Sequence, residues 1–258
     1  MSGPVTRPHN SGFTLIEVAV VIAIIGLLLG ALLVPLATQV QATKIKATDK
    51  SLEEIREALL GFAITNGRLP CPDTGTDGIE DGGGAAVCNN QQGTLPYASL
   101  GVAPLDAWGR RYTYRVTAEF TRNPVPGSVC VAVPPDNRLG LCDVGDITIS
   151  GRVTDPNVND KVERNLGVAS AAVVVSHGPN GLGGSDLNGV AMAAVAAGTD
   201  EAENANADAV FQFRSVSPPQ GACSETDVAQ PFCEFDDRVI WLSPNVLFNR
   251  LVTAGVLP

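Results

Sequence analysis

The chain has 258 residues and a formal net charge of −10, with 17 lysines and arginines against 27 aspartates and glutamates. This acidic balance argues against a general nucleic-acid binder, because phosphate binding needs clustered positive side chains. Hydrophobic residues make up 45% of the chain and charged residues only 17%, which argues against wholesale disorder. The chain has only two histidines, so a dedicated zinc enzyme is close to excluded.

A long uncharged segment comes first along the chain. No charged residue lies between Glu17 and Lys44, and residues 18–34 are all apolar or glycine. With the residues that follow, this run reaches the ~20 positions that a membrane-spanning helix needs, so a transmembrane segment is predicted at about 14–36. A secretory signal peptide cleaved after Ala42 is the rival interpretation, but its apolar core should span only roughly 7–15 residues. We therefore expect the segment to be retained.

The heptapeptide at residues 11–17 (SGFTLIE) leads into this apolar run. Glu17 places a carboxylate at the edge of the run, where a charge without a partner is costly. The heptapeptide resembles the type IV prepilin motif, in which a peptidase cuts after the glycine and methylates the new terminal amine. The resemblance implies a cytoplasmic leader of residues 1–12, cleavage after Gly12 and a mature chain that begins with methylated Phe13.

The same resemblance gives Glu17 a role in filament assembly, opposite the terminal amine of a neighbouring subunit. Two opposite charges that lose their water together satisfy each other, whereas either one alone is costly. The implied partners are other pilin or pseudopilin subunits, the prepilin peptidase and an assembly platform in the inner membrane. Charge counting favours the reverse topology, since four basic residues at 44–56 follow the apolar run. We follow the family topology, with a single pass through the inner membrane and the head in the periplasm.

Helical spacing continues beyond the apolar run, and residues 13–66 are predicted to form one long helix that ends before Gly67. Short apolar runs separated by Gly, Pro, Asn and Asp follow, and in residues 111–118 buried tyrosines are expected to alternate with arginines on the polar face. A last helix is predicted after Ser243, with Pro244 as its first residue and Gly255 as its end. The strand candidates are residues 111–118, 128–133, 146–153, 169–176, 209–216 and 237–242.

These elements predict an α+β fold, in which a long N-terminal helix packs on an antiparallel sheet. The helix serves the membrane or filament core in its first half and carries a globular head, residues 67–258, on its amphipathic second half. A head of this size is large for a densely packed bulk subunit. We therefore expect a minor pilin or pseudopilin, and the sequence leaves open whether it serves a type IV pilus or a type II secretion system.

Six cysteines lie in the loops of the head. None forms a C-x-x-C motif, which excludes zinc-ribbon and thioredoxin-like sites. Six cysteines allow 15 pairings, and pairing between sequence neighbours is the simplest. Each such bond would stabilise the head by ~2–3 kcal/mol and would indicate an oxidising compartment. Buried free thiols in a cytosolic fold are the alternative. The expected pairs are Cys71–Cys88, Cys130–Cys142 and Cys223–Cys233.

Three segments of the head are similar to those of type II secretion pseudopilins. They are DAWG at residues 106–109, VVSHGPNG at 174–181 and FDDRVIWL at 235–242. Each is a weak signal alone, but their order behind a prepilin motif strengthens the resemblance.

Two acidic segments offer oxygen ligands for a hard cation such as Ca²⁺, and nothing in the sequence suits a softer metal. Some pseudopilins hold a structural calcium between a loop and a strand that begins with two aspartates, so the resemblance implies such a site. A weaker candidate is segment 73–81, which departs from the calcium-loop pattern and is otherwise a solvated acidic turn. The ligands of the first site would be Asp200, Glu203, Asp208, Asp236 and Asp237, and those of the second Asp73, Asp77 and Asp81.

Two other functions are alternatives to a non-enzymatic filament subunit. A membrane-anchored secreted hydrolase would have to use His177 beside Ser176, because the sequence contains no G-x-S-x-G, P-loop or H-E-x-x-H motif. A DNA-uptake minor pilin would bind DNA through the local basic patch around Trp108, against which the acidic net charge counts. The basic residues of that patch are Arg110, Arg111 and Arg115.

Overall fold

The computed structural model describes residues 14–82, 87–122, 139–157 and 160–257, apart from the side chains of residues 29–37. The chain divides into two units, residues 1–44 and 45–258. The strand candidate at 128–133 lies outside the described residues.

The first element is the helix α1 (Leu15–Asn66), which confirms the predicted long helix. It ends where Gly67 adopts a positive φ of 72° and donates its N–H to the carbonyl of Ala63. Only glycine takes this left-handed conformation without steric cost, so the sequence fixes the end of the helix. Among the described side chains, no helix has a stretch that is both long and apolar enough to cross a membrane. The span predicted at about 14–36 extends into the undescribed side chains of 29–37.

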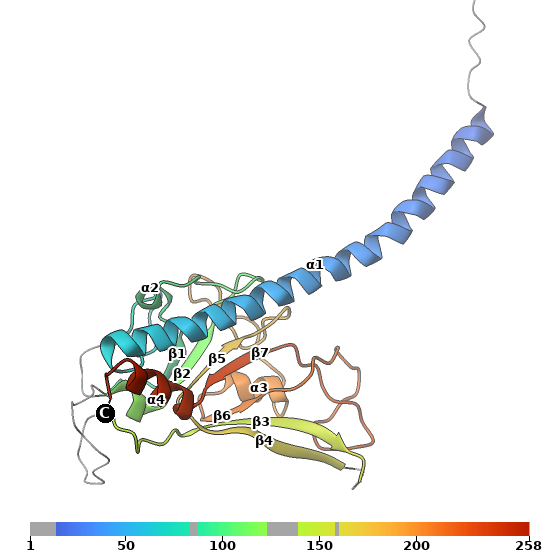
Figure 1. Ribbon diagram of the computed structural model, residues 1–258. Coiled ribbons are helices and arrows are strands. Elements are labelled where there is room, and N and C mark those ends of the chain that lie inside the picture. The colour runs from blue at the N-terminus through green and yellow to red at the C-terminus, as the bar shows by residue number, and fades with distance from the viewer. Residues whose placement is uncertain (1–13, 83–86, 123–138, 158–159, 258) are drawn as a thin grey trace, which may run out of the picture. The chain divides into compact units, whose positions relative to one another are not determined.

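A four-stranded antiparallel sheet forms the centre of the head (Figure 1). Its order is β1-β2-β5-β7, and in the central register Val174 of β5 lies between Tyr114 of β2 and Ile240 of β7. All five residues of β5 are buried, because this strand is covered on both faces. The strands are β1 (Gln92–Thr94), β2 (Thr113–Val116), β5 (Ala172–Ser176) and β7 (Arg238–Leu242).

A second sheet packs against the other side of β5 and β7. It has the order β4-β3-β6 and consists of β3 (Ile147–Asp155), β4 (Asp160–Ser170) and β6 (Val210–Gln212). The hairpin β3–β4 is antiparallel, but β6 runs parallel to β3. The central sheet on which α1 packs is antiparallel, which confirms the predicted α+β fold, and the second sheet adds one parallel pair, β3 with β6.

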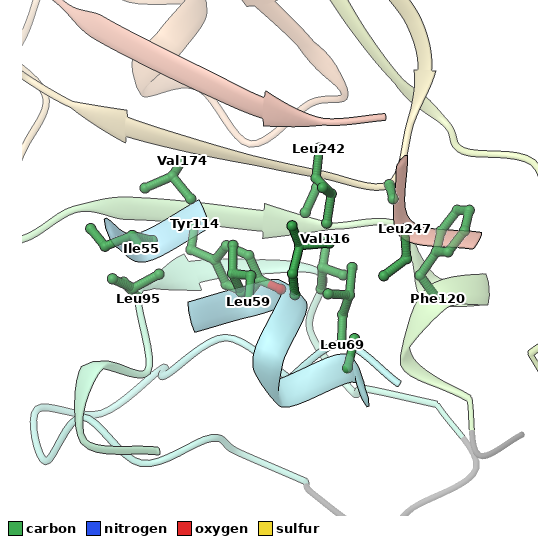
Figure 2. Packing of buried hydrophobic residues seen from close by; sticks show 14 of the residues in the cluster. Ile55, Leu59, Leu69, Leu95, Tyr114, Val116, Phe120, Val174, Leu242 and Leu247 are labelled. Atoms are coloured by element: carbon green, nitrogen blue, oxygen red, sulfur yellow. The ribbon is translucent and has the colours of Figure 1, made fainter. Parts of the chain in front are cut away.

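Two hydrophobic cores result from this layering. In the first, Leu52, Ile55 and Leu59 recur at helical spacing on α1 and pack against the central sheet, as Figure 2 shows for Ile55 and Leu59. Burying each such side chain stabilises the fold by ~1.5–3 kcal/mol. In the second core, the alternate side chains Val173 and Val175 of β5 meet the sheet that contains β3 and β6.

Short helices complete the head. They are α2 (Tyr97–Leu100), a 3₁₀ turn (Ala118–Thr121), α3 (Asp200–Ala205) and α4 (Pro244–Thr253). The last helix confirms the prediction, with Pro244 as its first residue and Gly255 at a positive φ of 73° just after it. The Ser243 side chain makes no capping hydrogen bond, so this helix start rests on proline and on burial of Leu247 and Leu251.

Two of the expected disulfides are present, Cys71–Cys88 and Cys223–Cys233. Cys142 is also disulfide-bonded. Cys130, its expected partner, lies outside the described residues. Free thiols, the alternative, do not occur among the described cysteines.

Candidate functional site

The start of α1 is built as a capping box. The backbone N–H and the hydroxyl of Thr14 each donate to Glu17 Oε2 at 2.8 Å, and the Glu17 N–H donates back to Thr14 Oγ1 at 3.3 Å. Such reciprocal bonds satisfy amide groups that the first helical turn leaves without partners. The three-residue spacing of Thr14 and Glu17 is the sequence signal that could have predicted this capping box. Gly12 and Phe13 lie outside the described residues.

The helix that follows presents apolar side chains on all sides. Leu15, Ile16 and Leu27 are 88%, 71% and 77% exposed. Continuous exposed apolar surface of this kind marks a site of contact with membrane or protein. Residues 15–28 therefore have the surface of a segment that contacts a membrane or another protein.

The DAWG segment at 106–109 is a structural turn. Asp106 Oδ1 accepts the N–H groups of Trp108 and Arg110, both at 2.9 Å, while Oδ2 accepts the Ser176 hydroxyl at 2.7 Å. Gly109 takes the positive φ of 82° that closes the turn. The motif thus fixes the segment before β2 against the end of β5.

Three buried carboxylates meet at the end of the central sheet. Glu201 comes from α3, and Asp236 and Asp237 directly precede β7. Each offers an oxygen within 4.8 Å of the others, although these residues are only 2%, 8% and 2% exposed. The Thr199 hydroxyl caps α3 by accepting the Ala202 N–H, which fixes the turn that carries Glu201 inward.

Hydrogen bonds satisfy only part of this acidic cluster, defined as Glu201, Asp236 and Asp237. Glu201 Oε1 accepts the Asp236 N–H at 2.8 Å, and Asp237 Oδ2 accepts the Asn204 side-chain amide at 2.9 Å. The Oδ1 atoms of Asp236 and Asp237 are buried and have no hydrogen-bond partner among the residues that the structure describes. Nδ1 of buried His177 also lacks one and lies 3.7 Å from Asp237 Oδ1.

Burial makes the charged form of this cluster unfavourable. It raises the pKa of Asp236 to about 7, although the Asn180 N–H opposes the shift, and the Glu201 carboxylate adds to it. Burial likewise raises the pKa of Glu201, and it raises that of Asp237 well above the usual range. Neighbouring carboxylates in a poorly solvated site repel each other unless a bound proton or a cation neutralises part of their charge. Oxygen-only donors suit Ca²⁺, so the residues present fit a hard cation.

Only two of the five predicted calcium ligands belong to the acidic cluster. Asp236 and Asp237 belong to the acidic cluster, where the third member is Glu201. Asp200 faces away, because Arg214 Nε and Arg152 Nε bind its carboxylate at 2.6 and 2.9 Å. The other two predicted ligands, Glu203 and Asp208, bind the side-chain amide of Asn206 and are not part of the group.

Segment 73–81 is organised by hydrogen bonds. Buried Asp73 accepts the N–H groups of Gly75 and Gly78 and lies 3.5 Å from Nη1 of buried Arg111. Asp77 accepts the Ile79 N–H, and Asp81 accepts the Thr74 N–H. Within the described ranges these carboxylates do not form a group that could hold a metal ion.

The arginines of the predicted DNA-binding patch each have partners within the head. Arg110 donates to the carbonyls of Gly178 and Pro179, and Arg115 pairs with Asp146, while Arg111 is buried. These arginines therefore form no common basic surface with Trp108.

Ser176 and His177 do not form a catalytic pair. Ser176 donates to Asp106, and His177 Nε2 lies 2.8 Å from Thr113 Oγ1. Burial, and next the Arg110 charge, lower the pKa of His177 to about 4.

Comparison with known protein families gives two matches, both within residues 7–125. Residues 7–33 match the prokaryotic N-terminal methylation motif, and residues 35–125 match type II secretion system (T2SS), protein G. The second match includes the rest of α1, β1, the DAWG turn and β2. No curated protein and no solved structure is significantly similar to the chain. These two matches, which together lie within residues 7–125, support a type IV pilin-like or type II secretion pseudopilin family for the chain.

Proposed function

We propose that the protein is a structural, non-enzymatic subunit of a type IV pilus or type II secretion pseudopilus. Prepilin peptidase would cut after Gly12 and methylate Phe13. The subunit would wait in the inner membrane, with its head in the periplasm, until the assembly platform adds it to the filament. The observation that carries this proposal is the methylation motif at residues 7–33 attached to a helix with apolar side chains exposed on every side.

Assembly gives the exposed segment its cover and Glu17 its charged partner. In the single chain, Thr14 holds the Glu17 carboxylate by two hydrogen bonds. In a filament, the methylated amine of a neighbour would approach this oriented carboxylate as apolar helices exclude water around it. Pairing the two charges lowers the cost of desolvating them and therefore favours one axial register.

The test separates processing from assembly. We expect Glu17→Ala to leave cleavage and methylation intact but to lower incorporation into filaments, measured by mass spectrometry of sheared filaments and membranes. Glu54→Ala is the matched control, because Glu54 is an exposed glutamate on the same helix. A Gly12 substitution should leave the full-length protein in the membrane. Wild-type incorporation of Glu17→Ala would contradict the charge-pairing mechanism, and an intact Met1 terminus in native cells would contradict the whole proposal.

We further propose that the acidic cluster holds Ca²⁺ as a structural ion. Support comes from the unpartnered buried oxygens of Asp236 and Asp237, which a cation would satisfy. The ion would tie α3 to the start of β7 and thereby fix two segments that lie far apart in the sequence. Nothing in this role requires catalysis.

Calcium titration of the thermal unfolding curve tests this proposal. An ion present at one hundred times its Kd stabilises the folded state by ~2.7 kcal/mol, and for a head of this size we expect an increase in Tm of ~5–10 °C. Glu201→Gln should abolish the increase, whereas Asp208→Asn should keep it, because Asp208 lies outside the group. An equal response of both variants would refute the site.

A further inference from the structure

The Cys223–Cys233 disulfide borders the acidic cluster. A cavity of about 180 Å³ lies beside Glu201, and both cysteines line it together with Glu234. Cys233 also precedes the ligand Asp236 by only three residues. The bond therefore forms part of the wall of a cavity that buried Glu201 also lines.

Arg214 connects the disulfide loop to the helix that carries Glu201. Its Nη2 donates to the Cys233 carbonyl at 3.0 Å and to Glu225 Oε1 at 3.1 Å, and its Nε binds Asp200 Oδ2 at 2.6 Å. Asp200 is the first residue of α3, directly before Glu201. Loop and helix thus share one buried guanidinium.

The two described disulfides differ in their access to solvent. Cys71 and Cys88 are only 2% and 4% exposed, whereas Cys223 is exposed and its partner Cys233 is 7% exposed. A thiolate must reach a sulfur atom along the disulfide axis to exchange with it, so exposure decides which bond reacts. A dithiol reductant can therefore reach the Cys223 sulfur, whereas burial protects the Cys71–Cys88 bond from attack.

We propose that Cys223–Cys233 is a thiol-exchange site that controls retention of the cation in the acidic cluster; this inference rests on the calcium site proposed above. One thiolate of a dithiol reductant attacks Cys223 Sγ, which forms a mixed disulfide and releases Cys233 as a thiolate. The second thiol of the reductant then displaces the Cys223 thiolate. The protein gains two electrons and, after protonation, two thiols, while the dithiol becomes a disulfide.

Reduction removes the covalent closure of a loop whose cysteines are 10 positions apart. The freed loop gains conformational entropy, so the wall beside Glu201 opens more often. Water then reaches the carboxylates, and the cation leaves faster. The oxidised form holds the ion, and the reduced form releases it.

The experiment measures calcium release from the full mature chain in detergent. Calcium-loaded protein is mixed with a fluorescent chelator in a stopped-flow instrument, before and after mild dithiothreitol treatment, and alkylation followed by mass spectrometry identifies the reduced cysteines. We expect labelling of Cys223 and Cys233 and of exposed Cys142, unlabelled Cys71 and Cys88, and dissociation faster by about tenfold. Reoxidation with diamide should restore slow release, which makes the test independent of any variant.

Paired variants supply the control. Cys223→Ser with Cys233→Ser should release calcium fast with or without dithiothreitol, whereas Cys71→Ser with Cys88→Ser should retain the dithiothreitol response. An unchanged release rate with Cys223 and Cys233 fully reduced would overturn the inference and leave the calcium site intact. Failure of the oxidised protein to take up calcium would overturn both.

Discussion

Replacing Asp73 with alanine tests whether segment 73–81 is a structural loop or a cation site. Asp73 and Arg111 are 0% and 2% exposed, and the nearest charged atoms are 3.5 Å apart. At an effective dielectric constant of about 20, two unit charges at that separation attract by ~5 kcal/mol. Arg111 would keep the carbonyls of Gly75 and Thr76 as acceptors but would lose its counter-charge. Breaking a buried pair in this way costs ~3–5 kcal/mol.

The assay is urea unfolding followed by circular dichroism, with calcium and with a chelator. We expect Asp73→Ala to lower the free energy of unfolding by ~3–5 kcal/mol in both conditions. The double variant with Arg111→Met should lose less than the sum of the two single changes, because no buried charge is then left alone. A loss below about 1 kcal/mol would refute the ion-pair argument. A loss that disappears with the chelator would show that Asp73 acts as a cation ligand.

Three further predictions follow from single contacts. Thr14→Val removes the capping box and should lower filament incorporation, measured as for Glu17, while Thr14→Ser should keep it. Burial alone would raise the pKa of Glu80, but hydrogen bonds from Arg68 and from the Cys71 N–H lower it below its usual value. Glu80→Gln should therefore lower the free energy of unfolding by ~1.5–3 kcal/mol at pH 7. In urea titrations, this difference in stability between the two proteins should vanish as the pH falls through the lowered pKa. Gly178→Ala would place a Cβ against Asp236 Oδ1 at a φ of 54° and should abolish the calcium-dependent increase in Tm, whereas Gly101→Ala, with a φ of 69° and open space around it, should lose only conformational stability.

Local patterns sufficed for elements whose burial follows one periodicity. The helix α1 and the strand β5 were predicted because their apolar residues repeat at helical spacing or form one continuous run. The hairpin strand β4 was missed because most of its side chains are exposed, so its sequence shows no buried face. The parallel pairing of β6 with β3 was also missed, since strand direction depends on the course of the chain between residues 177 and 209, which no local pattern contains.

The candidate site shows the same division. Asp236 and Asp237 were expected as ligands because their segment resembles the final D-D strand of pseudopilins, but the residue of α3 that joins them is Glu201 and not the predicted Asp200. Arg214 and Arg152 draw Asp200 away, and only tertiary contacts show this. Arg111 was expected on the polar face of its strand and is buried instead, because Asp73 and two loop carbonyls satisfy its guanidinium.

The two-sided burial of β5 bears on how the head withstands proteases. Val174 belongs to the core beneath α1, whereas Val173 and Val175 belong to the core beneath β3 and β6. Removing either layer, α1 on one side or the sheet with β3 and β6 on the other, would expose one face of β5 to water. A partly opened form with one layer intact would therefore lose much of its stability. The head should therefore open as a whole in a single cooperative step and offer a protease few partly opened forms to cleave. All-or-none opening of this kind would protect the head from proteolysis in the filament proposed above, where the head would lie outside the cytoplasm.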